Sequence, residues 1–156
     1  MAGPRHLLIV FHSRSGGTQS LADAVVAGAT SDEIDDVEVR VLRAPDAGPD
    51  DLRWCDAVII GSPENFGYMS GLVKDFLERT FYVILNETRG LPYALFVKGD
   101  NDGSGAVRSI ERIVTGLQWK EALPPVVVTG DVTDDDRERC HELGITIAAG
   151  LEAGVF

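Results

Sequence analysis

A short apolar run, followed at once by a loop of small polar residues and an amphipathic helix, constrains the fold of this chain most strongly. Residues 7–11 (LLIVF) are too few for a helix and show no polar alternation. Such a run is typical of a strand buried on both faces. Residues 13–18 (SRSGGT) form the loop, and apolar side chains then recur at helical spacing over residues 21–28. The stretch predicts a strand, a tight loop and a helix whose first amides face a single spot.

The loop contains the residue types that bind a phosphate group. Gly16 and Gly17 permit a tight turn and a close approach of the backbone to a ligand. Ser13, Ser15 and Thr18 add hydroxyl donors, and one of them can cap the helix. A nest of amides can hold a phosphate without a counter-charge. The loop alone leaves two interpretations, a phosphate site and a tight turn without a ligand.

Composition narrows the class of protein. The chain has 156 residues, which suits one domain over residues 1–156, and no apolar run is long enough to span a membrane. With no leader-like segment ahead of the first strand, we expect a cytoplasmic protein. A net charge of −11 disfavours nucleic acid and anionic membranes as partners, and either solubility or a basic partner explains it. Cys55 and Cys140 lack metal-binding spacing and are expected to be buried thiols.

The rest of the chain alternates strands with helices. Further strands are expected at residues 37–42, 57–60, 92–97 and 124–128. The first of these alternates apolar with polar residues, which favours a position at or near the sheet edge. Helices are expected before, between and after these strands, with Ser70 and Thr133 as N-caps. Strands separated by helices form a parallel sheet, so we predict a doubly wound α/β fold with five strands in the order 2-1-3-4-5.

Three polar loops should converge at one end of this sheet. Ligands of such folds bind beyond the carboxyl ends of the strands, where loops 13–18, 62–68 and 99–105 would meet. The acidic cluster of a phosphate-accepting receiver domain, the lysine of a P-loop and the glycine spacing of a dinucleotide fold are missing there. The first loop also lacks the thiol of a small cysteine phosphatase. FMN remains, with its phosphate in the first loop and its ring across the other two.

Two segments carry a family resemblance. Residues 13–18 are similar to the flavodoxin pattern S/T-x-S/T-G-x-T. Residues 56–78 (DAVIIGSPENFGYMSGLVKDFLE) resemble WrbA-like NAD(P)H:quinone reductases and NAD(P)H-dependent FMN reductases, in which a strand ends in G-S-P and a loop carries F-G. The resemblance spans roughly residues 7–105. It implies a flavodoxin-like three-layer sandwich with one noncovalently bound FMN.

The resemblance also implies a set of cofactor-binding residues. The first loop would hold the FMN phosphate, the second would line the ring with Phe66 packed on it or on its rim, and the third would cover the opposite side. Glu64, Asp100 and Asp102 would then lower the potential of the flavin by charge repulsion. Neither a catalytic side chain nor a metal ligand is expected, because the flavin performs the redox chemistry. The expected contacts are Ser13, Ser15, Gly16, Gly17, Thr18, Pro63, Glu64, Asn65, Phe66, Gly67, Gly99, Asp100, Asn101 and Gly103.

The electron donor and acceptor are less constrained. Asn65 stands where the quinone reductases usually have arginine, and the loop at 98–103 departs from their T-G-x-x-x-G-G pattern. The resemblance favours an oxidoreductase that transfers electrons from NAD(P)H to a quinone or a flavin. One alternative is a one-electron carrier that serves a redox protein, and another is a nonredox binder of a phosphate ligand. The apolar residues 81–85 at the end of a helix suggest a homodimer.

Overall fold

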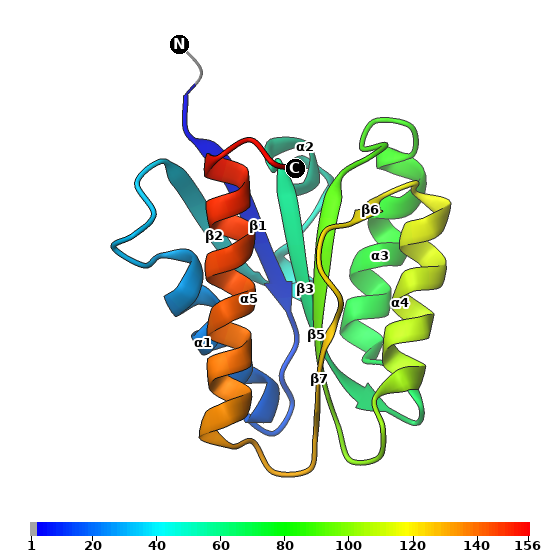
Figure 1. The fold of residues 1–156 in the computed structure, drawn as a ribbon. Helices are drawn as coiled ribbons and strands as arrows, with labels where there is room; N and C mark the ends of the chain where they lie inside the picture. The colour runs from blue at the N-terminus through cyan, green and yellow to red at the C-terminus, as the bar shows by residue number, and fades with distance from the viewer. Residues whose placement is uncertain (1–2) are drawn as a thin grey trace.

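The fold is built on one parallel sheet. The computed structural model describes residues 3–156. Its strands run in the order β2-β1-β3-β5, and β6 and β7 both pair with β5 (Figure 1). This arrangement confirms the predicted order 2-1-3-4-5, with the fifth position shared by two short strands. The parallel strands are β1 (Arg5–Phe11), β2 (Val37–Arg43), β3 (Ala57–Asn65), β5 (Pro92–Gly99), β6 (Lys120–Glu121) and β7 (Val126–Thr129).

Helices cover both faces of the sheet. Helices α1 and α5 lie side by side on one face, and α3 and α4 lie on the other (Figure 1). The helices are α1 (Gly17–Ala29), α2 (Pro49–Trp54), α3 (Gly71–Ile84), α4 (Ser104–Gly116) and α5 (Asp134–Glu152), with a 3₁₀ turn η1 (Ala44–Asp46). Within residues 3–156, no helix is both long enough and apolar enough to cross a membrane. The single domain expected for residues 1–156 stays a prediction.

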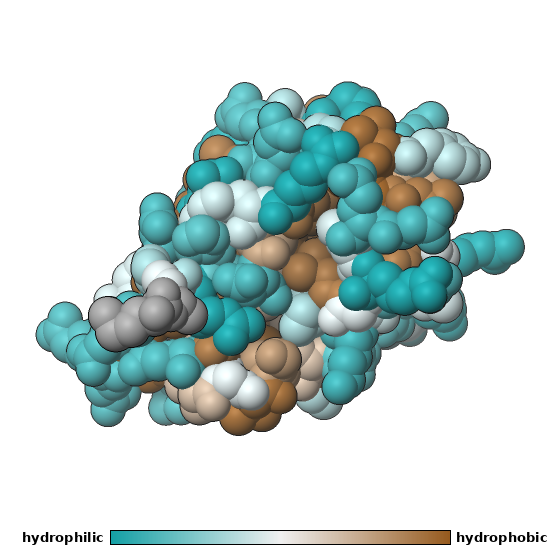
Figure 2. Space-filling model, turned by 90° about the horizontal axis from the view of Figure 1, so that it is seen from above, coloured by the Kyte–Doolittle hydropathy of each residue, from teal (hydrophilic) through white to brown (hydrophobic). Residues whose placement is uncertain are grey.

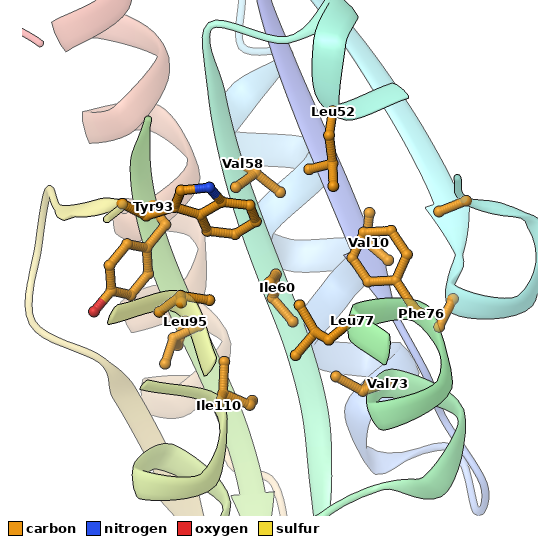
Figure 3. Close-up of a cluster of buried hydrophobic side chains, with 14 of the residues drawn as sticks. Val10, Leu52, Val58, Ile60, Val73, Phe76, Leu77, Tyr93, Leu95 and Ile110 are labelled. Carbon is orange, nitrogen blue, oxygen red and sulfur yellow. The ribbon is translucent and has the colours of Figure 1, made fainter. Parts of the chain in front are cut away.

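Strand β1 supplies side chains to both halves of the core. Leu8 and Val10 belong to the cluster under α3 and α4, whereas Leu7 and Ile9 belong to the cluster under α1 and α5. Figure 3 shows the first cluster, in which Phe76 on α3 packs with side chains from β1 and β3. A strand with both faces buried explains why residues 7–11 carry no polar alternation. Edge strand β2, by contrast, is only partly covered, and the predicted alternation holds at Val37 and Val39 but fails at Val41, which is exposed.

The segment after the third strand differs from the prediction. Residues 64–68 are not a loop, because β3 continues to Asn65 and then turns back as β4 (Tyr68–Met69). The pairing is antiparallel, with Glu64 opposite Met69 and Asn65 opposite Tyr68. Only two residues, Phe66 and Gly67, connect the strands. Both have positive φ, of 55° and 69°, as two-residue hairpin turns of this kind require.

The end of α3 contains both buried and exposed apolar residues. Ile84 lies in the core, whereas Tyr82 and Val83 are exposed by 83% and 50% of their surface. Phe81 packs beside the core, and a shallow pocket opens next to it. The buried Ile84 accounts for part of the apolar run at residues 81–85. Dimerisation through the rest stays a prediction.

Candidate functional site

The three polar loops meet at the carboxyl ends of β1, β3 and β5, at the bottom of Figure 1. A small cavity of about 80 Å³ lies between them. It brings together eight of the residues predicted from sequence. It also includes two cations, Arg14 and Lys98, that were not among the predicted contacts. The lining residues are Arg14, Ser15, Gly17, Thr18, Pro63, Glu64, Asn65, Lys98, Gly99 and Asp100.

The first loop prepares the start of α1 to bind an anion. Gly16 is the N-cap and has a φ of +98°, which a residue with a Cβ adopts only at a cost. Ser13 accepts a hydrogen bond at its Oγ from the backbone N–H of Gln19, at 3.0 Å. In residues 3–156, the N–H groups of residues 15–18 donate to no protein acceptor. These amides therefore remain available at the positive end of the α1 dipole.

Other helices of the chain satisfy their first amides with an oxygen from the protein. Ser70 accepts from Val73 N at the start of α3, and Thr133 accepts from Asp136 N at the start of α5. The start of α4 receives a carboxylate from a distant loop, that of Glu64. At the start of α1, the Gln19 N–H has such an acceptor in Ser13, but within residues 3–156 the N–H groups of residues 15–18 have none. These four amides and the hydroxyls of Ser15 and Thr18 form a donor set that fits a phosphate monoester.

Glu64 has a different role from the one expected. Its Oε2 accepts hydrogen bonds from the backbone N–H groups of Gly105 and Ala106, at 2.9 and 3.1 Å. The carboxylate thus lies against the N-terminus of α4, and its Cβ packs near Gly99. Glu64 still lines the cavity. However, the dipole of α4 offsets its negative charge, which weakens the case for Glu64 as a group that repels a reduced flavin.

The hairpin is held in place by hydrogen bonds at its base. Ser62 accepts from Ser70 N at 2.9 Å, and Ser109 on α4 accepts from Met69 N at 3.0 Å. Gly105 lets the backbone of Gly67 approach α4, because a Cβ at position 105 would overlap the Gly67 carbonyl. The hairpin is therefore packed against α4 along its length.

Phe66 stands at the tip of this hairpin. Its side chain is fully exposed, at 103% of its reference surface, in a left-handed backbone conformation. In the absence of a ligand, phenylalanine is an unfavourable residue here, because its ring is not buried and its backbone conformation is left-handed. An exposed ring held on a rigid turn beside a cavity is suited to contact a flat ligand.

The third loop is shaped by Gly103 and Asp102. Gly103 is the N-cap of α4 with a φ of +73°, and a Cβ there would overlap the side chain of Val127. Asp102 accepts from the N–H and hydroxyl of Ser104, at 3.0 and 2.9 Å, and these bonds lower the pKa of its carboxyl. Asp100 contacts the ammonium of Lys98. Asn101 lies exposed between the two aspartates.

His12 follows β1 directly and lies beside the first loop. Within residues 3–156, its Nδ1 is buried and has no hydrogen-bond partner. Burial lowers the pKa of the ring, and the nearby guanidiniums of Arg43 and Arg14 lower it further. His12 is therefore neutral around pH 7. Its proximity to two arginines shows that the first loop lies in a locally positive region of an acidic protein.

A larger hollow lies at the opposite end of the sheet, but its chemistry is less suited to a ligand. It measures about 320 Å³ and lies among the starts of the strands. Figure 2 looks down on this end, where hydrophilic side chains surround hydrophobic ones. Four of its charged residues are paired with one another, Arg5 with Asp56 and Arg53 with Glu87. Burial also raises the pKa of the Cys55 thiol there to about 12, so this cysteine is protonated and inert.

Comparison with known proteins agrees with this geometry. The family model for flavodoxin matches residues 9–144. A flavodoxin from Aquifex aeolicus is 25% identical across 91% of this chain and 84% of its own length. An NAD(P)H dehydrogenase (quinone) from Acidithiobacillus ferrooxidans is 34% identical, but over only 47% of this chain. The match covers 46% of that protein, so this chain corresponds to about half of it.

Solved structures share the same fold. A flavodoxin from the domain Archaea superposes with a TM-score of 0.79 at 24% identity, covering 94% of this chain and 98% of the other. A WrbA-like protein from Agrobacterium tumefaciens gives 0.69 at 16% identity, covering 93% and 96%. Both of the resemblances found in the sequence are thereby confirmed. With most of its length matched by one family model, and with a loop suited to a phosphate, the chain belongs to the flavodoxin family, and its cofactor is FMN.

Proposed function

We propose that the chain is an FMN-dependent oxidoreductase that transfers electrons from NAD(P)H to a quinone or a flavin. Its membership of the flavodoxin family establishes the coarser role, electron transfer through FMN. The finer role is supported by the similarity of about half of the chain to NAD(P)H dehydrogenases (quinone). Bound FMN supplies the redox chemistry, and the protein binds and orients it.

The observation that carries the FMN-binding part of the proposal is the set of free amides at the start of α1. These amides, with the hydroxyls of Ser15 and Thr18, would bind the phosphate. The backbone of residues 63–67 would lie along one side of the ring, with Phe66 against it, and the third loop (Gly99, Asp100, Asn101 and Gly103) would lie along the other. Ser13 accepts from the Gln19 N–H at its hydroxyl oxygen, which leaves its O–H free to donate to the phosphate.

A one-electron carrier is the second candidate. The similarity to a flavodoxin extends over 91% of this chain, whereas the similarity to the quinone dehydrogenases covers 47%. A carrier would use the acidic segments 100–102 and 131–136, the second of which includes the first turn of α5, to meet a basic redox protein. This candidate predicts reduction of such a protein by the flavin with little direct consumption of NAD(P)H.

FMN binding is tested first with the apoprotein. Quenching of FMN fluorescence and a rise in thermal stability are expected on adding FMN. Ser15→Asp should abolish both effects, because it places a carboxylate among the amides that would hold the phosphate. Thr133→Asp is the matched control, since it adds the same charge at the same end of the sheet but keeps a residue suited to the α5 N-cap. Failure of the unmodified protein to bind FMN would overturn the proposed function.

Anaerobic addition of NADH or NADPH to the FMN-loaded protein then separates the two candidates. Rapid bleaching of the flavin absorbance, followed by recovery when a quinone or free flavin is added, supports the oxidoreductase. If neither nucleotide bleaches the flavin but a chemical reductant does, the carrier is the correct assignment.

A further inference from the structure

Lys98 reaches from the end of β5 to the start of α1. It is paired with Pro63 across the sheet, and its side chain lies along Gly17. A Cβ built on Gly17 would lie 3.3 Å from the Cε of Lys98 and 3.6 Å from its Cδ. The absence of a side chain at position 17 therefore makes room for the lysine stem.

The side chain of Lys98 lines the candidate phosphate site. The lysine lines the same cavity as Ser15 and Thr18, whose amides have no protein acceptor in residues 3–156. Its side chain is only 21% exposed. Arg14, the other cation of the cavity lining, is an exposed residue. Lys98 is thus the more buried of the two positive charges that line the cavity beside the free amides of α1.

The ion pair that Lys98 makes within the protein is weak enough to be exchanged. Its Nζ lies 3.0 Å from Oδ1 of Asp100, whose side chain is 90% exposed. Ion pairs with an exposed partner contribute little, because water solvates the separated charges almost as well. A phosphate dianion beside the α1 amides would be a stronger partner, because it adds charge to hydrogen bonding.

We propose that Lys98 is a phosphate-binding residue that pairs with the FMN phosphate, and that Asp100 holds its ammonium when the cofactor is absent. The inference rests on the proposed FMN site and adds to it a cation that amide and hydroxyl donors do not supply. In a chain with a net charge of −11, such a cation offsets the long-range repulsion of a doubly charged ligand. Lys98 thereby selects FMN over riboflavin, which has the same ring and no phosphate.

The test compares the dissociation constants of FMN and riboflavin for a set of variants of the full chain. Lys98→Met should weaken FMN binding by about tenfold and leave riboflavin binding unchanged. Lys98→Arg keeps the positive charge and should lose less FMN affinity than Lys98→Met. Lys120→Met is the matched control, because Lys120 is exposed on β6 at the far end of β5. Asp100→Asn should tighten FMN binding a few-fold by releasing the ammonium.

Salt provides a second measurement, independent of catalysis. The FMN dissociation constant of the unmodified protein should rise with salt concentration more steeply than that of Lys98→Met, since screening weakens only a charge–charge contact. An equal loss of FMN and riboflavin affinity in Lys98→Met would overturn the inference, because it would place the lysine at the ring or in the fold. Unchanged FMN affinity would also overturn it while leaving the FMN site intact. If the unmodified protein binds neither flavin, both the inference and the proposed function are wrong.

Discussion

The carboxylate of Glu64 accepts a hydrogen bond from the backbone N–H of Gly105, at 2.9 Å, although the two residues are separated by 41 positions in the chain. This bond joins the end of β3 to the start of α4. It is reinforced by the bond from Ala106 N to the same oxygen. The second and third loops of the site are therefore fixed relative to each other before any ligand binds.

Removing this carboxylate should destabilise the fold. Glu64→Ala is expected to lower the free energy of unfolding by about 1–2 kcal/mol, because two amides of α4 lose a charged acceptor. Glu64→Gln should lower the free energy of unfolding by less, since its side-chain amide oxygen can still accept hydrogen bonds from the two backbone N–H groups. Urea unfolding followed by circular dichroism measures both changes. Glu78→Ala is the control, because Glu78 is 73% exposed on α3 and makes only a loose contact with Lys74. Equal losses at positions 64 and 78 would contradict the assigned role.

Gly105→Ala tests the packing of the hairpin on α4. The new methyl group would overlap the Gly67 carbonyl, so the hairpin tip must move. We expect a loss of about 1–3 kcal/mol in unfolding free energy, together with weaker FMN binding. Gly71→Ala on the first turn of α3 is the matched control, because nothing lies within 4 Å of its new methyl group. That variant should be neutral or slightly more stable. Unfolding curves and FMN titrations of both variants would show the difference.

Phe66→Asn should change stability and FMN binding in opposite directions. Asparagine tolerates the left-handed conformation that Phe66 adopts, and a fully exposed ring contributes no buried area. The apoprotein is therefore expected to gain about 0.5–1 kcal/mol of stability. FMN affinity should fall, since the proposed ring contact is lost. Tyr82→Asn replaces an exposed aromatic residue in an ordinary helical conformation and should produce neither effect. A drop in apoprotein stability for Phe66→Asn would show that the ring packs on the protein.

Glu111 should make stability depend on pH. Burial raises the pKa of its carboxyl above the usual value, and the neighbouring Glu121 raises it further, whereas Tyr93 opposes the shift. The folded protein therefore binds a proton at Glu111 more readily than the unfolded chain does. This contribution to stability is present below the ordinary pKa of 4.5 and is lost as the pH rises through the raised value.

The variant Glu111→Gln should accordingly raise the melting temperature at pH 7, and the gain should shrink as the pH falls below about 4.5. Glu142→Gln, at an exposed position on α5, serves as the control and should show no such trend. Melting temperatures of both variants measured between pH 3 and pH 8 would show whether the gain of Glu111→Gln depends on pH. A gain at position 111 that stays constant with pH would rule out this explanation.

Local patterns were enough to predict much of the fold. The unbroken apolar run of residues 7–11 predicts a strand with two covered faces, and Ser70 and Thr133 predict helix starts; all three agree with the structure. Each of these signals depends on residues that are adjacent in the sequence. The convergence of three loops follows equally directly, since the carboxyl ends of parallel strands lie at the same end of the sheet.

Contacts between distant segments could not be predicted in this way. The hairpin turn is Phe66-Gly67. A turn with positive φ at both positions is predicted from Asn, Asp or Gly at the first one, and phenylalanine gives no such signal. The role of Glu64 depends on the placement of α4, which no local pattern specifies. For Lys98, one feature of the sequence predicts its side of the sheet. Lys98 is two positions after Phe96, which faces α1 and α5, so strand alternation places the lysine on the α1 side of the sheet.

The bridge between Glu64 and α4 has a consequence for engineering the site. Glu64 accepts from the N–H groups of Gly105 and Ala106, and Met69 N donates to Ser109, so residues 62–70 are attached to α4 and the hairpin is not an independent module. Grafting it onto a related protein to alter ring contacts would drive the Gly67 carbonyl into any side chain at the position of Gly105. A transferable unit would have to include residues 103–109 as well. Substitutions in residues 62–70 and in residues 103–109 are therefore expected to occur together among related proteins.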